Sequence, residues 1–283
     1  RIQLYGFEGP PGAMGDRLAS FRSEIIASLA CFRSWSIVEG AQAPRREAAP
    51  TDYVLQALHV GGHEGGQRAA LTLSEASSGR ALWSETFEIG SGLLDGARRR
   101  TVGRIAALLE VYLASDRAGA APNAVAHDIV DEWLRAERLT TKWTSRSHDD
   151  AALAFEALIA RAPDFAPPHA SLAGLLNVRH IVRPGTLRDA EAARRAHRLA
   201  DRAVELDPLD ARNQLAVAWS AALDGSFDKA SIHMDMAARL NPNSPRTLMS
   251  SAMGFGFLGE RERAEALLAH SVECAPMLLG YQW

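Results

Sequence analysis

The chain has 283 residues, enough for about two domains, and its 47% hydrophobic content lets each of them bury a core, which excludes a disordered chain. A formal net charge of −3 gives no overall attraction to nucleic acid or to an anionic membrane. The longest apolar run, residues 25–32, is far shorter than the roughly 20 residues that span a bilayer.

The first residues predict a parallel pair of strands joined by a helix. Residues 1–7 and 34–38 have the composition of strands. Between them, residues 16–30 carry apolar side chains at helical spacing: Leu18, Phe21, Ile25, Ile26 and Leu29. A strand, a crossover helix and a second strand favour parallel pairing.

The next segment predicts an antiparallel meander. Three β-like runs cover residues 53–60, 69–75 and 81–89, and glycine- and serine-rich turns separate them. A helix over residues 93–113, with Val102, Ile105, Leu109 and Tyr112 on one face, closes the domain. We therefore expect an α/β domain over residues 1–117 and a linker over residues 118–126, which contains Gly119 and Pro122.

The remaining residues, 127–283, contain a repeat. Pro208, Pro242 and Pro276 recur at intervals of 34 residues, the tetratricopeptide period. Gly225 and Gly259 share that interval and fit the turn between two helices, since glycine readily adopts a positive φ. We expect an all-α solenoid of about four helix pairs that continues beyond this chain, and an α+β class for the whole.

The first two helix pairs are less regular than the last two. Pro163 precedes Pro208 by 45 residues, which is 11 more than the period, and we assign the surplus to the connection around residues 180–190. The surplus is either a plain helix extension or a lid over one end of the groove. Residues 133–161 supply the first pair.

Several segments together resemble a known arrangement. Asp52-Tyr53-Val54-Leu55, followed by a glycine-rich turn, and residues 78–87 resemble the TolB-like or FlgO-like α/β module. Residues 155–167 and 206–210 resemble the tetratricopeptide repeats that follow this module in bacterial regulators. The resemblance implies a missing N-terminal effector, either a winged helix of the SARP or CadC type or a class III adenylyl cyclase. The chain begins at Arg1 without a methionine, so we expect it to be part of a longer protein.

No residue pattern predicts catalysis, a cofactor or a bound metal. Residues 254–259 spell GxGxxG, but they lie inside an expected helix and not between a strand and a helix. His59 and His63 are separated by glycines that would break a helix carrying both as ligands. The basic run over residues 98–104 is either a solvated face or a contact for an anion or an acidic partner. Cys31 and Cys274 lie in helix-like apolar runs, as buried thiols of a reducing cytoplasm do.

The concave face of the solenoid, formed by the first helix of each pair, is the predicted binding surface. The alternative is that about half of its inward residues simply pack between helices. In the 34-residue frame, Ala170, Gly174, Leu215 and Ala222 also point inward. The candidate binding residues, rich in the aromatic, arginine and methionine side chains typical of interfaces, are Trp133, Trp143, Asn177, His180, Arg183, Arg212, Trp219, Arg246, Met249 and Met253.

Two functional hypotheses follow. The first is a cytoplasmic, non-catalytic region of a bacterial transcriptional regulator that senses a signal through protein–protein or small-ligand contacts in the groove. The second is the accessory region of a class III adenylyl cyclase. A third option is a scaffold protein that lacks any effector domain. We expect no direct nucleic-acid binding and no membrane insertion by this region, and self-association into a homo-oligomer stays open.

Overall fold

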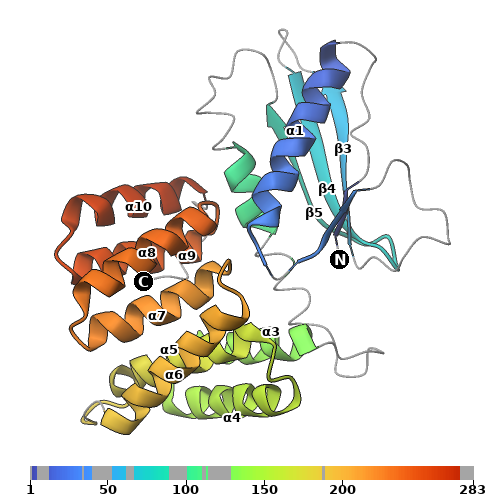
Figure 1. Ribbon diagram of the computed structural model, residues 1–283. Coiled ribbons are helices and arrows are strands. Elements are labelled where there is room, and N and C mark those ends of the chain that lie inside the picture. Colours follow the sequence, from blue (N-terminus) through green and yellow to red (C-terminus); the bar gives the residue numbers. More distant parts are fainter. Residues whose placement is uncertain are drawn as a thin grey trace. The chain divides into compact units, whose positions relative to one another are not determined.

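A computed structural model describes residues 2–4, 13–33, 35–39, 53–61, 67–88, 101–109, 113, 129–186 and 189–274 (Figure 1). The chain divides into two compact units, one built on Arg1–Tyr112 and the other on Leu113–Val272. The predicted linker, residues 118–126, lies outside the described residues. Within the described part, no helix is long and apolar enough to cross a membrane.

The first unit contains a five-stranded mixed sheet. Its strands are β1 (Ile2–Leu4), β2 (Ile37–Glu39), β3 (Tyr53–Gly61), β4 (Gln67–Glu75) and β5 (Ala81–Glu88), in the order β2-β1-β3-β4-β5. The parallel β1–β2 pair and the antiparallel β3–β4–β5 meander are confirmed. In addition, β1 pairs in parallel with β3, which joins the two predicted pieces into one sheet.

Helix α1 (Ala13–Ala30) covers one face of this sheet (Figure 1). Its residues Leu18, Phe21, Ile25 and Leu29 are buried, as their helical spacing predicts. Part of the predicted helix over residues 93–113 is also helical, at residues 101–109, where Val102, Ile105 and Leu109 are buried. Tyr112 lies outside the described residues.

The described residues of the second unit form a helical repeat solenoid of four antiparallel pairs. The pairs are α3 (Ile129–Thr140) with α4 (Ser145–Arg161), α5 (Ala166–Val182) with α6 (Ala190–Leu206), α7 (Ala211–Leu223) with α8 (Phe227–Leu240), and α9 (Pro245–Phe257) with α10 (Arg261–Cys274). Each first helix also packs against the first helix of the next pair, α3 on α5, α5 on α7 and α7 on α9. This stacking buries a continuous core along the solenoid.

The predicted glycine turns set the length of the last two pairs. Gly225 and Gly259 have φ values of +80° and +82°. One residue later, the backbone N–H of Ser226 bonds the carbonyl of Ala221 at 2.9 Å, and the N–H of Glu260 bonds that of Phe255 at 2.8 Å. Both turns are therefore Schellman motifs, which end the first helix and turn the chain into the second.

The 11 extra residues of the second pair are not confined to its connection. Helices α5 and α6 have 17 residues each, against 13 in α7 and 14 in α8. The expectation that the connection holds the whole surplus was therefore wrong. The surplus lengthens both helices as well as the turn between them. The end of the longer α5 reaches the start of α4, where Ser145 Oγ donates to the carbonyl of Val182 at 3.2 Å.

Small residues and ion pairs hold neighbouring pairs together. Alanines form the seam between the second and third pairs, with Ala173, Ala196, Ala200 and Ala203 fully buried, which lets the helices approach closely. Ion pairs join the second helices one after another: Arg195 of α6 with Glu156 of α4, Lys229 of α8 with Asp201 of α6, and Arg263 of α10 with Asp235 of α8. Such exposed pairs contribute modestly to stability but help fix the register of the stack.

Candidate functional site

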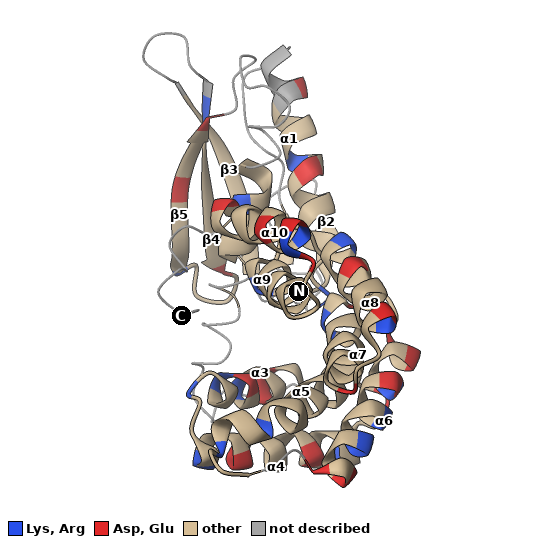
Figure 2. Cartoon of the chain, turned by 90° about the vertical axis from the view of Figure 1, so that its left-hand side faces the viewer, with Lys and Arg blue, Asp and Glu red and all other residues tan. Residues whose placement is uncertain are grey.

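The first helices of the four pairs carry the candidate site. Figure 2 shows α7 and α9 on the inner side of the curved solenoid, and α6 and α8 on its outer side. We define the inner face by nine side chains on α3, α5, α7 and α9: Trp133, Glu137, Ser171, Arg212, Trp219, Arg246, Ser250, Met253 and Phe257.

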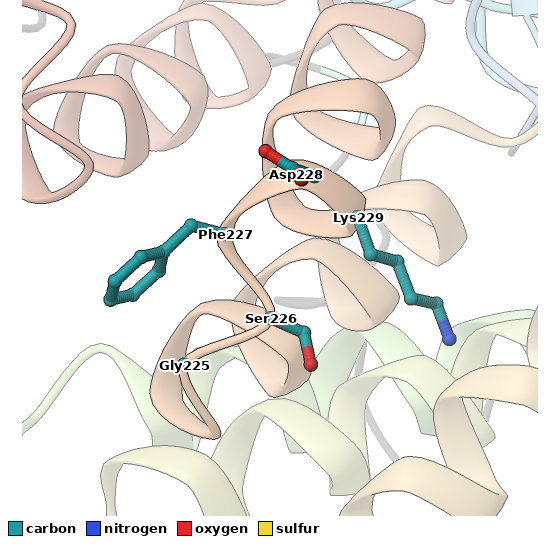
Figure 3. A pocket seen from close by; sticks show the side chains of 5 residues that line it. All are labelled: Gly225, Ser226, Phe227, Asp228 and Lys229. Atoms are coloured by element: carbon teal, nitrogen blue, oxygen red, sulfur yellow. The ribbon is translucent and has the colours of Figure 1, made fainter.

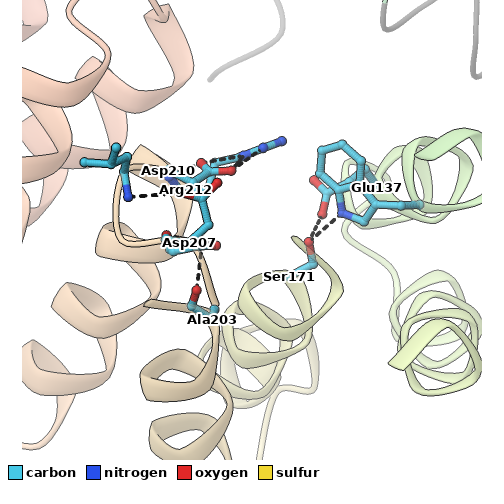
Figure 4. A network of polar contacts seen from close by, with 9 residues as sticks. Glu137, Ser171, Ala203, Asp207, Asp210 and Arg212 are labelled. Atoms are coloured by element: carbon cyan, nitrogen blue, oxygen red, sulfur yellow. Dashed lines mark hydrogen bonds and ion pairs between the residues drawn. The ribbon is translucent and has the colours of Figure 1, made fainter. Parts of the chain in front are cut away.

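A polar network ties the first pair to the second (Figure 4), and an ion pair extends it to the fourth. The indole N–H of Trp133 donates to the hydroxyl of Ser171 at 3.0 Å, and that hydroxyl donates to Glu137. The second oxygen of the Glu137 carboxylate accepts a bond of 2.9 Å from Arg246 of α9. Since a solenoid repeat normally contacts only its neighbours, this ion pair is a direct link between the first pair and the fourth.

Arg212 of α7 approaches the same helix, α3, by a different contact. Its guanidinium lies 4.6 Å from the ring centroid of Trp133, a cation–π distance. Asp210, which caps the N-terminus of α7, accepts from Arg212 Nε at 2.9 Å and orients the guanidinium. Arg212 and Arg246 are 34 residues apart, and their targets Trp133 and Glu137 are one turn apart on α3. Equivalent arginines of two repeats therefore both face α3.

In both ion pairs the carboxylate is the more buried partner. The side chain of Glu137 is 12% exposed and that of Arg246 is 66% exposed. For the second pair the values are 5% for Asp210 and 28% for Arg212. Although each pair is neutral, the groups nearest to solvent are guanidinium groups, and these can donate to a carboxylate with two parallel bonds.

The other end of the inner face is apolar. Trp219 of α7 donates its indole N–H to Ser250 of α9 at 2.9 Å, and its ring centroid lies 6.3 Å from that of Phe257. Phe257 also makes an edge contact with Phe227 of α8 at 6.5 Å. Met253 lies one turn before Phe257 and is 62% exposed. We call Trp219, Phe227, Met253 and Phe257 the aromatic patch.

A shallow hollow adjoins this patch at the α7–α8 turn. It is lined by Gly225, Ser226, Phe227, Asp228 and Lys229 (Figure 3). The Phe227 ring points away from the side chains of Ser226 and Lys229, so the lining groups do not converge on one point. The hollow extends the accessible surface of the patch and does not form an enclosed ligand site.

The structure brings five of the predicted binding residues onto the inner face. Trp133, Arg212 and Arg246 meet around α3, and Trp219 and Met253 lie in the aromatic patch.

Two predicted binding residues face into the core. Asn177 donates to Ser220 of α7 at 2.9 Å and is buried between the helices, and Met249 is also buried. The expectation that they present accessible surface was wrong, and Ala170 is buried as well. Adjacent positions of a helix point about 100° apart, so Ala170 and Ser171 cannot both face the groove. With α5 packed against α7, Ser171 faces the groove and Ala170 faces the core.

Three more predicted residues lie near the α4 end of the solenoid. Trp143 is exposed in the α3–α4 turn, with its ring 5.8 Å from that of His148. Arg183 ends α5 and forms an ion pair with Asp149 of α4, and His180 lies in the last turn of the same helix. None of the three takes part in the network around α3 or in the aromatic patch.

Four residues of the inner face are absent from the sequence prediction: Glu137, Ser171, Ser250 and Phe257. Glu137 and Phe257 each lie four residues after a predicted residue, Trp133 and Met253, so extending the helical stripe by one turn would have found them. Ser171 and Ser250 each lie eight residues after a helix-ending proline, and that shared position was a usable signal.

The described residues contain no group of histidine, cysteine and acidic side chains that could hold a metal ion. His59 lies on β3 opposite Ala69, and His63 lies outside the described residues. Of the basic run, Arg104 is described and forms an ion pair with Glu85, whereas residues 98–100 are not described. Burial raises the pKa of the Cys274 thiol to about 11, which opposes nucleophilic reactivity.

The GxGxxG segment is a packing feature of α9. Gly254 faces the side chain of Met234, so that a Cβ at this position would lie 2.1 Å from the Met234 sulfur. Gly259 ends the helix with a positive φ. Gly254 and Gly259 therefore serve helix packing and helix termination, and helix α8 precedes them where a dinucleotide site requires a strand.

No family model and no curated protein matches the chain. Among solved structures, a thermophilic TPR protein of Thermus thermophilus is similar, with 19% identity, a TM-score of 0.46, and coverage of 65% of this chain and 87% of that chain. MamA from Desulfovibrio magneticus RS-1 has 15% identity and a TM-score of 0.36, and covers 63% of this chain and 88% of its own. Another MamA structure, MSR-1, has 17% identity and a TM-score of 0.34, with 62% and 94% covered.

Proposed function

We propose that the solenoid is a non-catalytic, tetratricopeptide-type binding region that holds a segment of a protein partner on its inner face. The observation that carries this proposal is the aromatic patch. Met253 and Phe257 are 62% and 56% exposed on neighbouring turns of α9, and Phe227 of α8 lies against Phe257. Exposed aromatic and methionine side chains that lie together are typical of protein interfaces.

The inner face also offers a rigid support for a partner. Trp219 is fixed by its bond to Ser250 and by packing against the core around Ala218 and Met234. Fixed aromatic anchors lose little conformational freedom on binding, which favours affinity. The outer side also presents exposed apolar residues, Ile232 and Met236, which lie one turn apart on α8 and neither of which is aromatic.

We further propose that this region serves a cytoplasmic bacterial regulator, in which partner binding changes the activity of an effector domain outside residues 1–283. The resemblance of residues 52–87 to TolB-like modules supports this role, as does their order before the repeats. In this proposal residues 1–117 form the α/β module and residues 127–283 the binding solenoid. The accessory region of a nucleotide cyclase is the alternative.

Site-specific photo-cross-linking tests the binding function. The full-length protein carries benzoylphenylalanine at Phe257 on the inner face or, as a matched control of 60% exposure, at Ile232 on α8. We expect a discrete protein adduct at position 257 and none of the same mass at position 232. The adduct is identified by mass spectrometry, and the purified partner is titrated against wild type and Met253→Ala. Equal adducts at both positions, or an affinity that Met253→Ala leaves unchanged, would contradict the proposal.

A further inference from the structure

We infer that the inner face selects an acidic protein segment, and that the Glu137 carboxylate holds the place on Arg246 that a partner carboxylate takes on binding. This inference rests on the proposed binding function and specifies the partner chemistry. The starting observation is the contact between Glu137 of α3 and Arg246 of α9, which lie 109 positions apart in the sequence.

The two arginines make the solvent-facing part of the network positive. Arg246 is 66% exposed while its counter-ion Glu137 is 12% exposed, and Arg212 is more exposed than Asp210. A guanidinium has five N–H donors, and the contact with Glu137 uses Nη2 of Arg246. A carboxylate arriving from solvent can therefore reach Arg246 before Glu137 has left it.

Glu137 is held in a way that allows this exchange. When Arg246 turns toward a partner, the Glu137 carboxylate keeps the bond from Ser171, so it is not left without a donor. The exchange replaces one charge-assisted bond with another, and its free energy stays small. Glu137 then acts as an internal competitor that lowers the affinity for weakly acidic segments.

The aromatic patch defines the rest of the preferred segment. Met253 and Phe257 follow Arg246 by two and three turns along the same face of α9. A segment that lies along α9 would therefore place acidic side chains at Arg246 and apolar side chains at the patch. Arginine and aromatic side chains can also bind single-stranded nucleic acid, so the test includes an RNA strand as the alternative occupant.

The test uses three fluorescent peptides of equal length with the same leucine anchors. They carry glutamate, glutamine or lysine at the other positions, and affinity is measured by anisotropy with the 283-residue chain at low and high salt. We expect the glutamate peptide to bind most tightly and the lysine peptide least. Arg246→Gln should lower the affinity for the glutamate peptide by about five- to tenfold, whereas Glu137→Gln should raise that affinity severalfold.

Matched controls separate local contacts from net charge. Arg239→Gln on α8 and Glu265→Gln on α10 change the net charge by the same amounts at exposed ion pairs, and we expect neither to alter the affinity. Arg246→Lys keeps the charge and should retain part of the affinity, which covers the case in which Arg246→Gln does not fold. Thermal melts of every variant establish that the fold is intact.

Several results would overturn the inference. They are a glutamate peptide that binds no better than the glutamine peptide, an affinity that Glu137→Gln lowers or leaves unchanged, and a panel in which no peptide binds. An oligouridylate strand that binds more tightly than the glutamate peptide, and that Arg246→Gln releases, would assign the face to RNA instead. If Arg246→Gln does not change the affinity for a partner cross-linked at position 257, the acidic preference is rejected and the binding function is retained.

Discussion

Trp219 of α7 donates its indole N–H to the hydroxyl of Ser250 on α9, and Trp133 of α3 makes the same kind of bond to Ser171 on α5. The two serines occupy equivalent places, each eight residues after a helix-ending proline. The same pairing thus joins the first helix to that of the next pair at both ends of the described solenoid. It fixes two large aromatic side chains of the inner face without removing them from it.

The two bonds should differ in their contribution to stability. Ser250→Ala leaves the N–H of the half-buried Trp219 near solvent, so we expect a loss of about 0.5–1 kcal/mol in the free energy of unfolding. Ser171→Ala removes the acceptor of the buried Trp133 and a donor to Glu137, so we expect about 1.5–3 kcal/mol. Urea unfolding measures both, and equal losses would show that the two bonds are not distinguished by burial.

Met253→Ala should separate binding from stability. Met253 is 62% exposed, so we expect its truncation to change the free energy of unfolding by less than about 0.5 kcal/mol while it weakens partner binding by about 1–2 kcal/mol. Trp219→Ala should lower both quantities, since Trp219 packs against two core clusters and contacts Phe257. Thermal melts run beside the binding titration make the comparison, and a large destabilisation by Met253→Ala would refute the exposed placement.

The sequence predicts the helices well because residues close together in the chain determine where each helix ends. Glycines at a 34-residue interval, Gly225 and Gly259, end first helices with a positive φ, and prolines follow the second helices. Local turn residues and the spacing of apolar residues likewise predict the meander and the parallel pair. Each of these features depends on residues within a few positions of one another.

The inner face depends on longer-range geometry and was predicted only in part. Which side of α5 faces the groove is decided by its packing on α7, including the Asn177–Ser220 bond, and not by spacing within α5. The Arg246–Glu137 pair depends on the curvature that accumulates over four helix pairs. A small rotation per pair separates or joins residues 109 positions apart, and a single sequence does not specify that rotation.

Buried histidines should make the solenoid less stable as the pH falls. Burial lowers the pKa of His169 and of His148 below the ordinary 6.5. In each ring Nε2–H donates to a backbone carbonyl, of Pro163 or Thr140, and the buried Nδ1 has no partner among the described residues. The neutral ring is therefore favoured in the fold, and its stability contribution is complete above pH 6.5. It is lost as the pH falls from there through the lowered pKa of the folded state.

His169→Gln offers a direct check of this pH dependence. Gln214 holds the equivalent place in the third pair and donates to the carbonyl of Pro208 at 2.7 Å, so glutamine can replace the histidine bond without a titrating group. Urea unfolding at about pH 7.5 and about pH 5 should show a smaller loss of stability in the variant than in wild type. An unchanged pH dependence would mean that His169 does not titrate differently in the folded and unfolded states.

The extension of α5 should contribute to packing and not to binding. Arg183 forms its ion pair with Asp149 of α4, and His180 lies in the last helical turn. Arg183→Ala should cost less than about 1 kcal/mol of stability, as exposed pairs do, and leave partner affinity unchanged. The charge-swapped variant Arg183→Asp with Asp149→Arg should recover the loss. A clear drop in affinity without a change in the melt would instead support a lid over the groove.

Two helical glycines should respond in opposite ways to alanine. A Cβ at Gly254 of α9 would meet the sulfur of Met234, which is buried between α8 and α9, so the side chain must shift within a filled core. We expect Gly254→Ala to destabilise the solenoid by about 1–3 kcal/mol through overpacking, even though alanine is the better helix former.

At Gly174 of α5 an added Cβ meets no atom within 4 Å. Gly174→Ala should therefore stabilise by about 0.5–1 kcal/mol, because only the lower backbone entropy cost remains. Urea unfolding of the pair, together with Met234→Ala in the Gly254→Ala background to relieve the clash, measures the difference. Equal effects at the two glycines would show that Gly254 is not held by helix contact, and the GxGxxG segment would then lack its packing explanation.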